Sequence, residues 1–311
     1  MTFTTIQGAC DLHLHSSPDI FPRILDDVDY AQICRDAGMR AIVLKCHADS
    51  TMGRAYHTMK QVKGIQVFGG IVLNHQAGGI NPAAVDVALQ LGAVQVWMPT
   101  YHSQAHFLET GLLGAYSHQG NGKHDYDLQG ITILDEMGAL IPEVYQILEL
   151  VKKHNAIIST GHLSVQESLA LIAAAREVGC QRVVMTHPFY SPPSCSIKDI
   201  KKAVELGAFV EFCASNPLNP LPKQIDMRLY VECVEQMGSD SFIISSDCGH
   251  PRKTTPPESI RMFIQTLNYM GVSERHIWPM IKDNYDYLLD LGNVGETKDN
   301  IAAAESEVVL K

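Results

Sequence analysis

Short apolar runs alternate along this chain with longer segments whose apolar residues recur at helical spacing. A short run rich in Val, Ile or Phe is typical of a buried strand, and helical spacing is typical of an amphipathic helix. Several helical segments end in Gly, which is common where a helix stops. The pattern predicts strands at residues 9–15, 40–47, 66–73, 93–99, 156–162, 182–187, 208–213 and 242–247.

Strands that alternate with helices predict an α/β fold built on a parallel sheet. Eight strands are the number that closes a (β/α)8 TIM barrel, and 311 residues are enough, since such barrels need roughly 250. The alternative, a doubly wound open sheet, would favour a Gly-rich phosphate loop after the first strand, and DLHLHSSPD contains none. We therefore predict one barrel domain over residues 1–294 and a polar tail at 295–311.

One long segment after the fourth strand, residues 103–140, interrupts the alternation. Its tip is rich in Gly, His and Tyr, and ITILDEMGAL indicates a β-hairpin. An insertion at the carboxyl end of a barrel strand overhangs the active-site face, so we interpret it as a lid or pocket wall. The alternative is an irregular surface loop or an oligomer contact. Its histidines, His106, His118 and His124, are expected at the surface.

Composition and charge argue against several classes of protein, including nucleic-acid-binding, membrane-spanning and secreted ones. The formal net charge of −10 gives no electrostatic footprint for nucleic acid. No apolar run approaches the roughly 18 residues that would span a membrane, and the N-terminus lacks a secretory signal, so we expect a cytoplasmic protein. The eight cysteines form no C-x-x-C pair and are expected to be reduced, mostly buried thiols. The 14 histidines raise the expectation of a metal site.

Five polar residues end four different predicted strands. His13 and His15 stand two apart on the first strand, so both side chains project to the same side. His162, His187 and Asp247 end the fifth, sixth and eighth strands, and the carboxyl ends of barrel strands converge on one face. Any single one of these histidines could be an ordinary core residue, but the set favours a site for one or two Zn²⁺ ions, with Mn²⁺ or Fe²⁺ as alternatives.

These strand-end residues resemble the metal-dependent amidohydrolase superfamily of TIM-barrel metallohydrolases, in an uncharacterised branch. The family pattern is H-x-H on strand one, a bridging Lys or Glu on strand four, His on strands five and six, and Asp on strand eight. The resemblance covers residues 8–292 and includes KDNYDYLLDLG near its end. It implies a metal-dependent enzyme, but leaves the substrate open.

The fourth strand departs from the family pattern, because AVQVWMPTYHS offers neither Lys nor Glu as a bridge. One interpretation is a single metal held by His13, His15, His162 and Asp247, with His187 free to polarise a substrate carbonyl. In the other, the bridge comes from VLKCHA on strand two. There, Lys45 could be carbamylated and bridge two metals, His47 could bind a second one, or unmodified Lys45 could contact substrate.

The predicted reaction is hydrolysis of an amide, cyclic amide or imide, lactone or ester in a small molecule by a metal-activated water. In it Asp247 is the general base and His187 stabilises the oxyanion. The alternatives are a single-metal decarboxylase of an aromatic or unsaturated acid, a phosphoesterase, and a binding barrel without catalysis. The partners expected are a small-molecule substrate and further copies of the chain in a homo-oligomer, with neither nucleic acid nor membrane.

Residues in the loops at the same face are candidates for substrate contacts. Arg54 and Arg252 would together favour a carboxylate-bearing substrate, since a guanidinium pairs with a carboxylate in bidentate fashion. The full set of substrate-binding candidates is Asn74, His75, Tyr101, His102, Arg54, His250 and Arg252.

Overall fold

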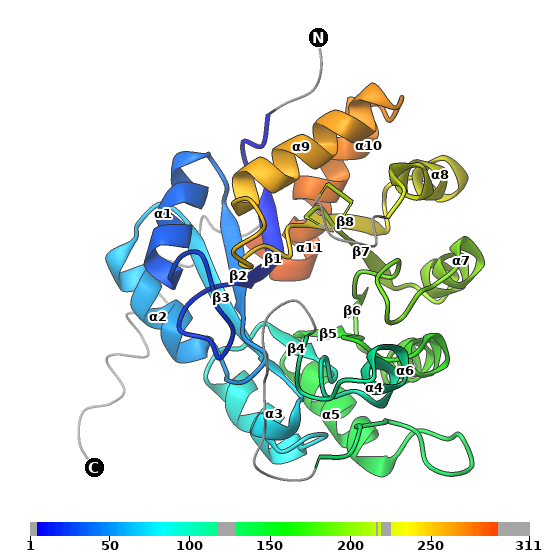
Figure 1. Cartoon of the computed structure of the whole chain (residues 1–311). Coiled ribbons are helices and arrows are strands. Elements are labelled where there is room, and N and C mark those ends of the chain that lie inside the picture. Colours follow the sequence, from blue (N-terminus) through cyan, green and yellow to red (C-terminus); the bar gives the residue numbers. More distant parts are fainter. Residues whose placement is uncertain (1–4, 117–127, 216, 219–224, 292–311) are drawn as a thin grey trace.

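The computed structural model describes residues 5–116, 128–215, 217–218 and 225–291. Its eight strands are parallel and lie in chain order from β1 to β8, which confirms the predicted (β/α)8 TIM barrel (Figure 1). Every predicted strand overlaps an observed one. The strands are β1 (Cys10–His15), β2 (Ala41–Lys45), β3 (Gln66–Val72), β4 (Gln95–Trp97), β5 (Ile157–Ser159), β6 (Arg182–Met185), β7 (Phe209–Cys213) and β8 (Phe242–Ser245).

The ring closes between β1 and the residues that follow β8. The backbone N–H of Asp247 donates to the carbonyl of His13, and that of His15 donates to the carbonyl of Cys248, both at 2.9 Å. Leu14 and Cys248 form an isolated parallel bridge at the same place. Closure therefore extends past the end of β8 and puts Asp247 beside the two histidines of β1.

Helices surround the strands on the outside (Figure 1). Serine caps begin two of them, because Ser164 and Ser196 each form a reciprocal capping box with the acidic residue three positions later. The elements outside the sheet are α1 (Asp27–Asp36), α2 (Met52–Gln61), η1 (His75–Ala77), α3 (Pro82–Gln90), α4 (Gln104–Thr110), α5 (Pro142–Lys153), α6 (Val165–Val178), α7 (Ile197–Glu205), α8 (Met227–Met237), α9 (Pro256–Tyr269), α10 (Glu274–Trp278), η2 (Pro279–Asp283) and α11 (Asn284–Leu289).

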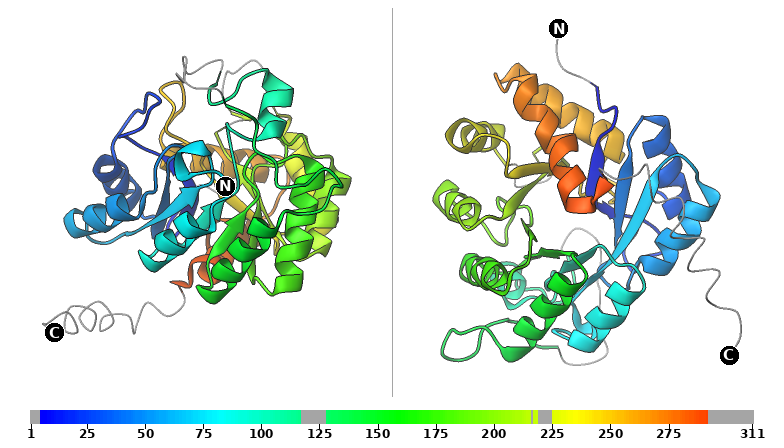
Figure 2. Two further views of the ribbon diagram at one scale, coloured as in Figure 1. Left: turned by 90° about the horizontal axis from the view of Figure 1, so that it is seen from below. Right: turned by 180° about the vertical axis from the view of Figure 1, so that it is seen from behind.

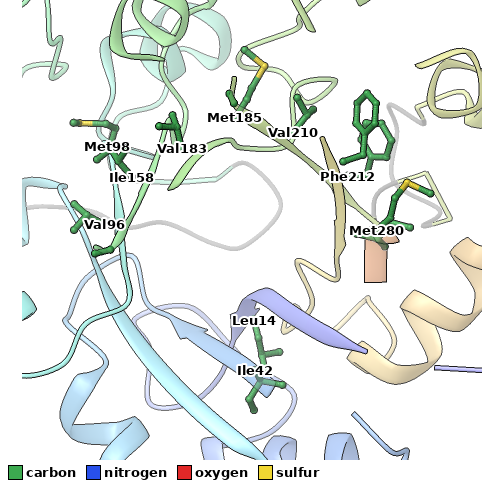
Figure 3. Packing of buried hydrophobic residues seen from close by; sticks show 14 of the residues in the cluster. Leu14, Ile42, Val96, Met98, Ile158, Val183, Met185, Val210, Phe212 and Met280 are labelled. Atoms are coloured by element: carbon green, nitrogen blue, oxygen red, sulfur yellow. The ribbon is translucent and has the colours of Figure 1, made fainter. Parts of the chain in front are cut away.

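Two apolar layers hold the barrel together. The larger lies between strands and helices and includes Leu14, Ile42 and Phe212 (Figure 3). The smaller fills the barrel interior, where Leu12 and Trp97 pack in one cluster with Tyr285 of α11. Figure 2 shows α11 and α4 at opposite ends of the barrel. The amino ends of the strands are thus covered by α11, and polar groups at the carboxyl ends are left for chemistry.

The connection between β4 and α5 is long and runs over residues 98–141. Leu134 and Leu140 form an antiparallel bridge, as expected for the predicted hairpin. Residues 117–127 of the predicted insertion, with His118 and His124, lie outside the described residues, as does the predicted tail at 295–311. Among the helices of the described part, none is long and apolar enough to cross a membrane.

Candidate metal centre

A break in the strand register aims the two β1 histidines into the barrel mouth. The pairing of β1 with β2 shifts between Asp11 and Leu14. Cys10 and Leu12 belong to the interior cluster, whereas Leu14 belongs to the outer one. A bulge of this kind re-aims the side chains that follow it. His13 and His15 therefore face the barrel interior. In a regular strand this would be impossible, because Leu12, the neighbour of His13, also faces inward.

Asp11 holds this irregular segment in place. Its Oδ1 atom accepts hydrogen bonds from the backbone N–H of His13 at 2.9 Å and of Ser246 at 3.0 Å. The carboxyl group is completely buried, and burial raises its pKa to about 6 in spite of these bonds. Asp11 thus ties β1 to the end of β8 directly below the candidate ligands.

Three candidate ligands meet at one point. The Oδ1 atom of Asp247 lies 3.2 Å from Nε2 of His13 and 3.5 Å from Nε2 of His15. Ligand atoms about 2.0–2.1 Å from a tetrahedral Zn²⁺ lie about 3.3 Å from one another. The observed separations therefore fit a shared ion, and the nitrogen and oxygen donors suit a Zn²⁺-class cation.

His162 and His187 extend this group. Their ring centroids are 5.0 Å apart, and that of His187 is 5.8 Å from that of His13. The Nδ1 atoms of His15, His162 and His187 are buried without a hydrogen-bond partner among the described residues. Unpartnered buried polar atoms are rare and costly, so these imidazoles fit a role in binding a metal or a substrate.

The backbone is strained at two of these positions. His187 has φ of 23° and Asp247 has φ of 51°, in the left-handed region that non-glycine residues rarely adopt. Each residue lies two positions past the end of its strand, where the chain leaves the barrel. Such outliers concentrate at functional sites, where the surrounding structure imposes them.

The electrostatic environment suits metal binding. Burial lowers the pKa of His15 and His162 well below the ordinary value and that of His187 to about 3, so these imidazoles are neutral, as ligands must be. Burial acts to raise the pKa of Asp247, but Lys253 and the β1 histidines outweigh it and hold the pKa well below its usual range. The Nζ atom of Lys253 donates to Oδ2 of Asp247 at 3.0 Å and to its carbonyl at 2.7 Å.

Lys45 and His47 contact different parts of the candidate site. The buried Nζ atom of Lys45 lies 3.0 Å from Nε2 of His13, and burial lowers its pKa to about 8. His47 has a partner at each nitrogen, with Thr100 Oγ1 2.8 Å from Nδ1 and Tyr116 OH 3.3 Å from Nε2. Lys45 thus contacts the ligand set directly, whereas His47 contacts both His15 and Tyr116 of the β4–α5 connection.

Two of the predicted substrate contacts, Asn74 and Arg54, make hydrogen bonds within the protein. The Nδ2 atom of Asn74 donates to Thr100 Oγ1 at 2.7 Å and to the carbonyl of His47 at 3.0 Å. Asn74 is completely buried, so its amide links neighbouring strand ends. Arg54 pairs with Asp27 at 2.8 Å and also donates to carbonyls of the loop after β1. Its guanidinium therefore fixes that loop, whereas Arg252 lies in the loop after β8.

The other substrate candidates lie around the mouth. Tyr101 packs edge-on against His47 with centroids 5.2 Å apart, and His75 and His102 are 4.8 Å apart. His250 is buried, and its Nδ1 accepts from the backbone N–H of Arg252 at 3.1 Å. The side chain of Arg252 is exposed and lines a hollow together with Ser215, Lys253, Thr254 and Ser259.

Several residues of the site were missed in the sequence. His106, expected at the surface, is 2% exposed, and its ring lies 5.7 Å from that of His162, so that expectation is wrong. Tyr116 and Lys253 come from loops, whose contacts no periodicity reveals. Glu211 had a visible signal, a charged residue inside the apolar run AFVEFC, because a buried Glu is almost always paired. The prediction that most cysteines are buried is confirmed, because all eight are.

Solved structures with the same fold include several enzymes. An amidohydrolase from Pseudomonas aeruginosa has a TM-score of 0.61 at 14% identity, over 92% of this chain and 95% of that one. A 2,6-dihydroxybenzoate decarboxylase from Rhizobium has a TM-score of 0.53 at 13% identity, over 92% and 99%. The phosphotriesterase homology protein from Escherichia coli has a TM-score of 0.55 at 15% identity, over 89% and 97%.

At these identities the likeness establishes the shared barrel, as expected from the resemblance to amidohydrolases. No curated protein sequence matches the chain. Residues 8–211 match the model of a family of unknown function, DUF6282. This match spans β1 to the middle of β7 and includes His13, His15, His162 and His187. Because it covers well over half of the chain, the chain belongs to the DUF6282 family.

Proposed function

We propose that this protein is a metal-dependent hydrolase that cleaves an amide, cyclic amide or imide, lactone or ester bond in a small molecule. The observation that carries the proposal is the meeting of His13, His15 and Asp247 at separations that suit one Zn²⁺-class ion. Neutral imidazoles and a carboxylate held ionised are the protonation states that this chemistry needs. His162, His187 and Lys45 are the additional ligand candidates.

The chain's own residues supply the proton transfers. A bound Zn²⁺-class cation provides an acidic water, with a pKa lowered from 15.7 to about 7. Asp247 can take a proton from that water, because its Oδ1 faces the ligand nitrogens while Lys253 holds Oδ2. The same carboxyl group then delivers the proton to the leaving group. His187 is neutral and can donate a hydrogen bond to the developing oxyanion.

A decarboxylase is the second candidate. The observation that favours it is that β4, Gln95–Trp97, offers no Lys or Glu to bridge two metals. The same ligands could then hold a single ion, against which an aromatic or unsaturated acid binds. A phosphoesterase would also use these ligands and is the third candidate. In either hydrolysis or decarboxylation, Arg252 at the exposed rim is our proposed contact for a substrate carboxylate.

The test is metal stoichiometry followed by a three-part activity screen. The purified chain is stripped of metal, reloaded with Zn²⁺, Mn²⁺ or Fe²⁺, and its metal content is measured by mass spectrometry. It is then tested on lactones, amides and cyclic imides, on aromatic acids with detection of carbon dioxide, and on generic phosphoesters. We expect one or two ions per chain and metal-dependent turnover in the first group. Carbon dioxide release with no hydrolysis would replace our proposal with the decarboxylase.

Two further features of the proposal are testable with the same preparation. We propose that the substrate is a small molecule, because the candidate histidine ligands lie buried in the barrel mouth. We also propose that the protein is a homo-oligomer, to be checked by light scattering of the full chain. A monomer at all concentrations would refute the second feature and leave the proposed chemistry unaffected.

A further inference from the structure

Glu211 is a buried carboxylate that the proposed reaction does not use. It lies in the middle of β7, its side chain is completely buried, and its Oε2 atom is 3.1 Å from Nδ1 of His13. Burying a carboxylate is costly unless it is paired and hydrogen-bonded. An apolar residue would pack in the barrel interior without this cost, so the charge of Glu211 calls for a function.

The two nitrogens of His13 face different partners. Nδ1 faces Glu211, whereas Nε2 faces Asp247 Oδ1 at 3.2 Å and Lys45 Nζ at 3.0 Å. Both nitrogens thus face a carboxylate, which only accepts hydrogen bonds, but Nε2 also faces the ammonium of Lys45, which only donates. The proton of a neutral His13 ring therefore belongs on Nδ1. The lone pair is then on Nε2, where the ammonium of Lys45 can donate to it and where a metal would bind.

A different arrangement at Nδ1 is chemically less suitable. Cys213 Sγ lies 3.7 Å from the same nitrogen, and His13, Glu211 and Cys213 could together be considered for a second ion. His13 could bind a second ion through Nδ1 only as a fully deprotonated imidazolate, because its Nε2 already faces the first group of ligands. The short contact between Glu211 and His13 is therefore better explained as a hydrogen bond than as two ligands of a second ion.

We propose that Glu211 is a positioning residue of the metal centre, which fixes His13 as the Nδ1–H tautomer and places a negative charge behind this ligand. The inference rests on the proposed function, because it assigns a role within the same centre. Carboxylates that hold the second nitrogen of a ligating histidine orient the ring and increase its basicity, and their loss typically costs about 10–100-fold in metal affinity.

The substitution Glu211→Gln keeps the shape of the side chain and removes its charge. We expect the dissociation constant for Zn²⁺, measured by competition with a chromophoric chelator, to rise about 10–100-fold. The unfolding midpoint of the metal-free variant should stay close to that of the metal-free wild type, because the Gln carbonyl can still accept the hydrogen bond from His13 Nδ1. A merely structural role for Glu211 would have the opposite signature, a lower midpoint with unchanged affinity.

Glu167→Gln is the matched control. Glu167 is also a buried carboxylate, but it accepts from Ser164 and Thr132 at the start of α6. The control should lower the unfolding midpoint and leave the affinity for Zn²⁺ within about twofold of wild type, because its hydrogen bonds serve a helix cap.

The tautomer itself provides a readout that needs neither metal nor activity. The ¹⁵N shifts of His13 in the metal-free wild type should show a protonated Nδ1 and an unprotonated Nε2. An Nε2–H tautomer, or Glu211→Gln with wild-type affinity, would overturn the inference. If the wild type binds no divalent cation, the proposed function fails, whereas the tautomer still decides the role of Glu211. If Glu211→Gln does not fold, Glu211→Asp, with its shorter reach, should weaken metal binding in the same direction.

Discussion

At the scale of single residues, Asp247 has two proposed roles, as a metal ligand and as the general base. Its Oδ1 faces two ligand nitrogens and its Oδ2 faces Lys253. In Asp247→Asn the amide cannot accept the proton of a metal-bound water, so we expect kcat/KM to fall about 10²–10⁴-fold. Metal content should fall as well, while circular dichroism stays native. Asp36→Asn, at an exposed carboxylate, is the control and should be neutral. An Asp247→Asn enzyme with near-wild-type rate and metal content would refute this role.

Residue-scale prediction from the sequence worked where the fold itself places a side chain. His13, His15 and Asp247 are brought together because they end strands of one barrel, and that follows from counting strands. Glu211 and Lys253 were missed because their roles depend on which groups face them across the barrel. The i, i+2 spacing of His13 and His15 correctly predicts that they share one face, although the bulge that turns them inward is not visible in the sequence.

At the scale of elements, α11 should contribute to stability without contributing to the site. Leu288 is 1% exposed and packs in the interior cluster at the amino ends of the strands. Leu288→Ala should lower the free energy of unfolding by about 2–5 kcal/mol, through lost burial and a residual cavity. Urea unfolding measures this. Leu91→Ala at the C-cap of α3, where the side chain is 67% exposed, should change this free energy by less than about 0.5 kcal/mol. Zn²⁺ affinity should be retained in both variants, and its loss in Leu288→Ala would contradict the separation of the two ends.

Whole strands were easier to predict than loops, for a physical reason. A buried strand needs a continuous apolar run, so all eight were found, with ends displaced by up to three residues, as where β5 stops at Ser159. The helix α4 was not predicted, because it is short and its contacts are made with the barrel mouth. His106 lies on α4, and its burial is therefore a property of the β4–α5 connection as a whole.

At the scale of the whole molecule, gathering neutral imidazoles in one buried site makes the stability of the metal-free chain depend on pH. His15, His162 and His187 have lowered pKa values when folded but titrate near 6.5 when unfolded. The stability that depends on their neutral form is fully present above about pH 6.5. It is lost as the pH falls from there toward their pKa values in the folded state, about 3 for His187. Each can lower the free energy of unfolding by up to about 1.4 kcal/mol per pH unit in that interval.

The buried carboxyl groups do not cancel this trend. The lowered pKa of Asp247 costs stability only below about pH 4, where the unfolded carboxylate takes up a proton. Asp11 acts in the opposite direction, because its raised pKa of about 6 makes the folded state bind a proton first, which offsets one histidine between about pH 6 and 4.

Urea unfolding of the metal-free chain should therefore show a clear loss of stability from pH 7.5 to 5.5, and His162→Gln should reduce the slope. With Zn²⁺ bound the chain should be more stable at each pH, by a margin that shrinks as protons compete for the ligands. A metal-free chain whose stability is constant over this range would show that the histidines are not held neutral, and that the centre is not preformed.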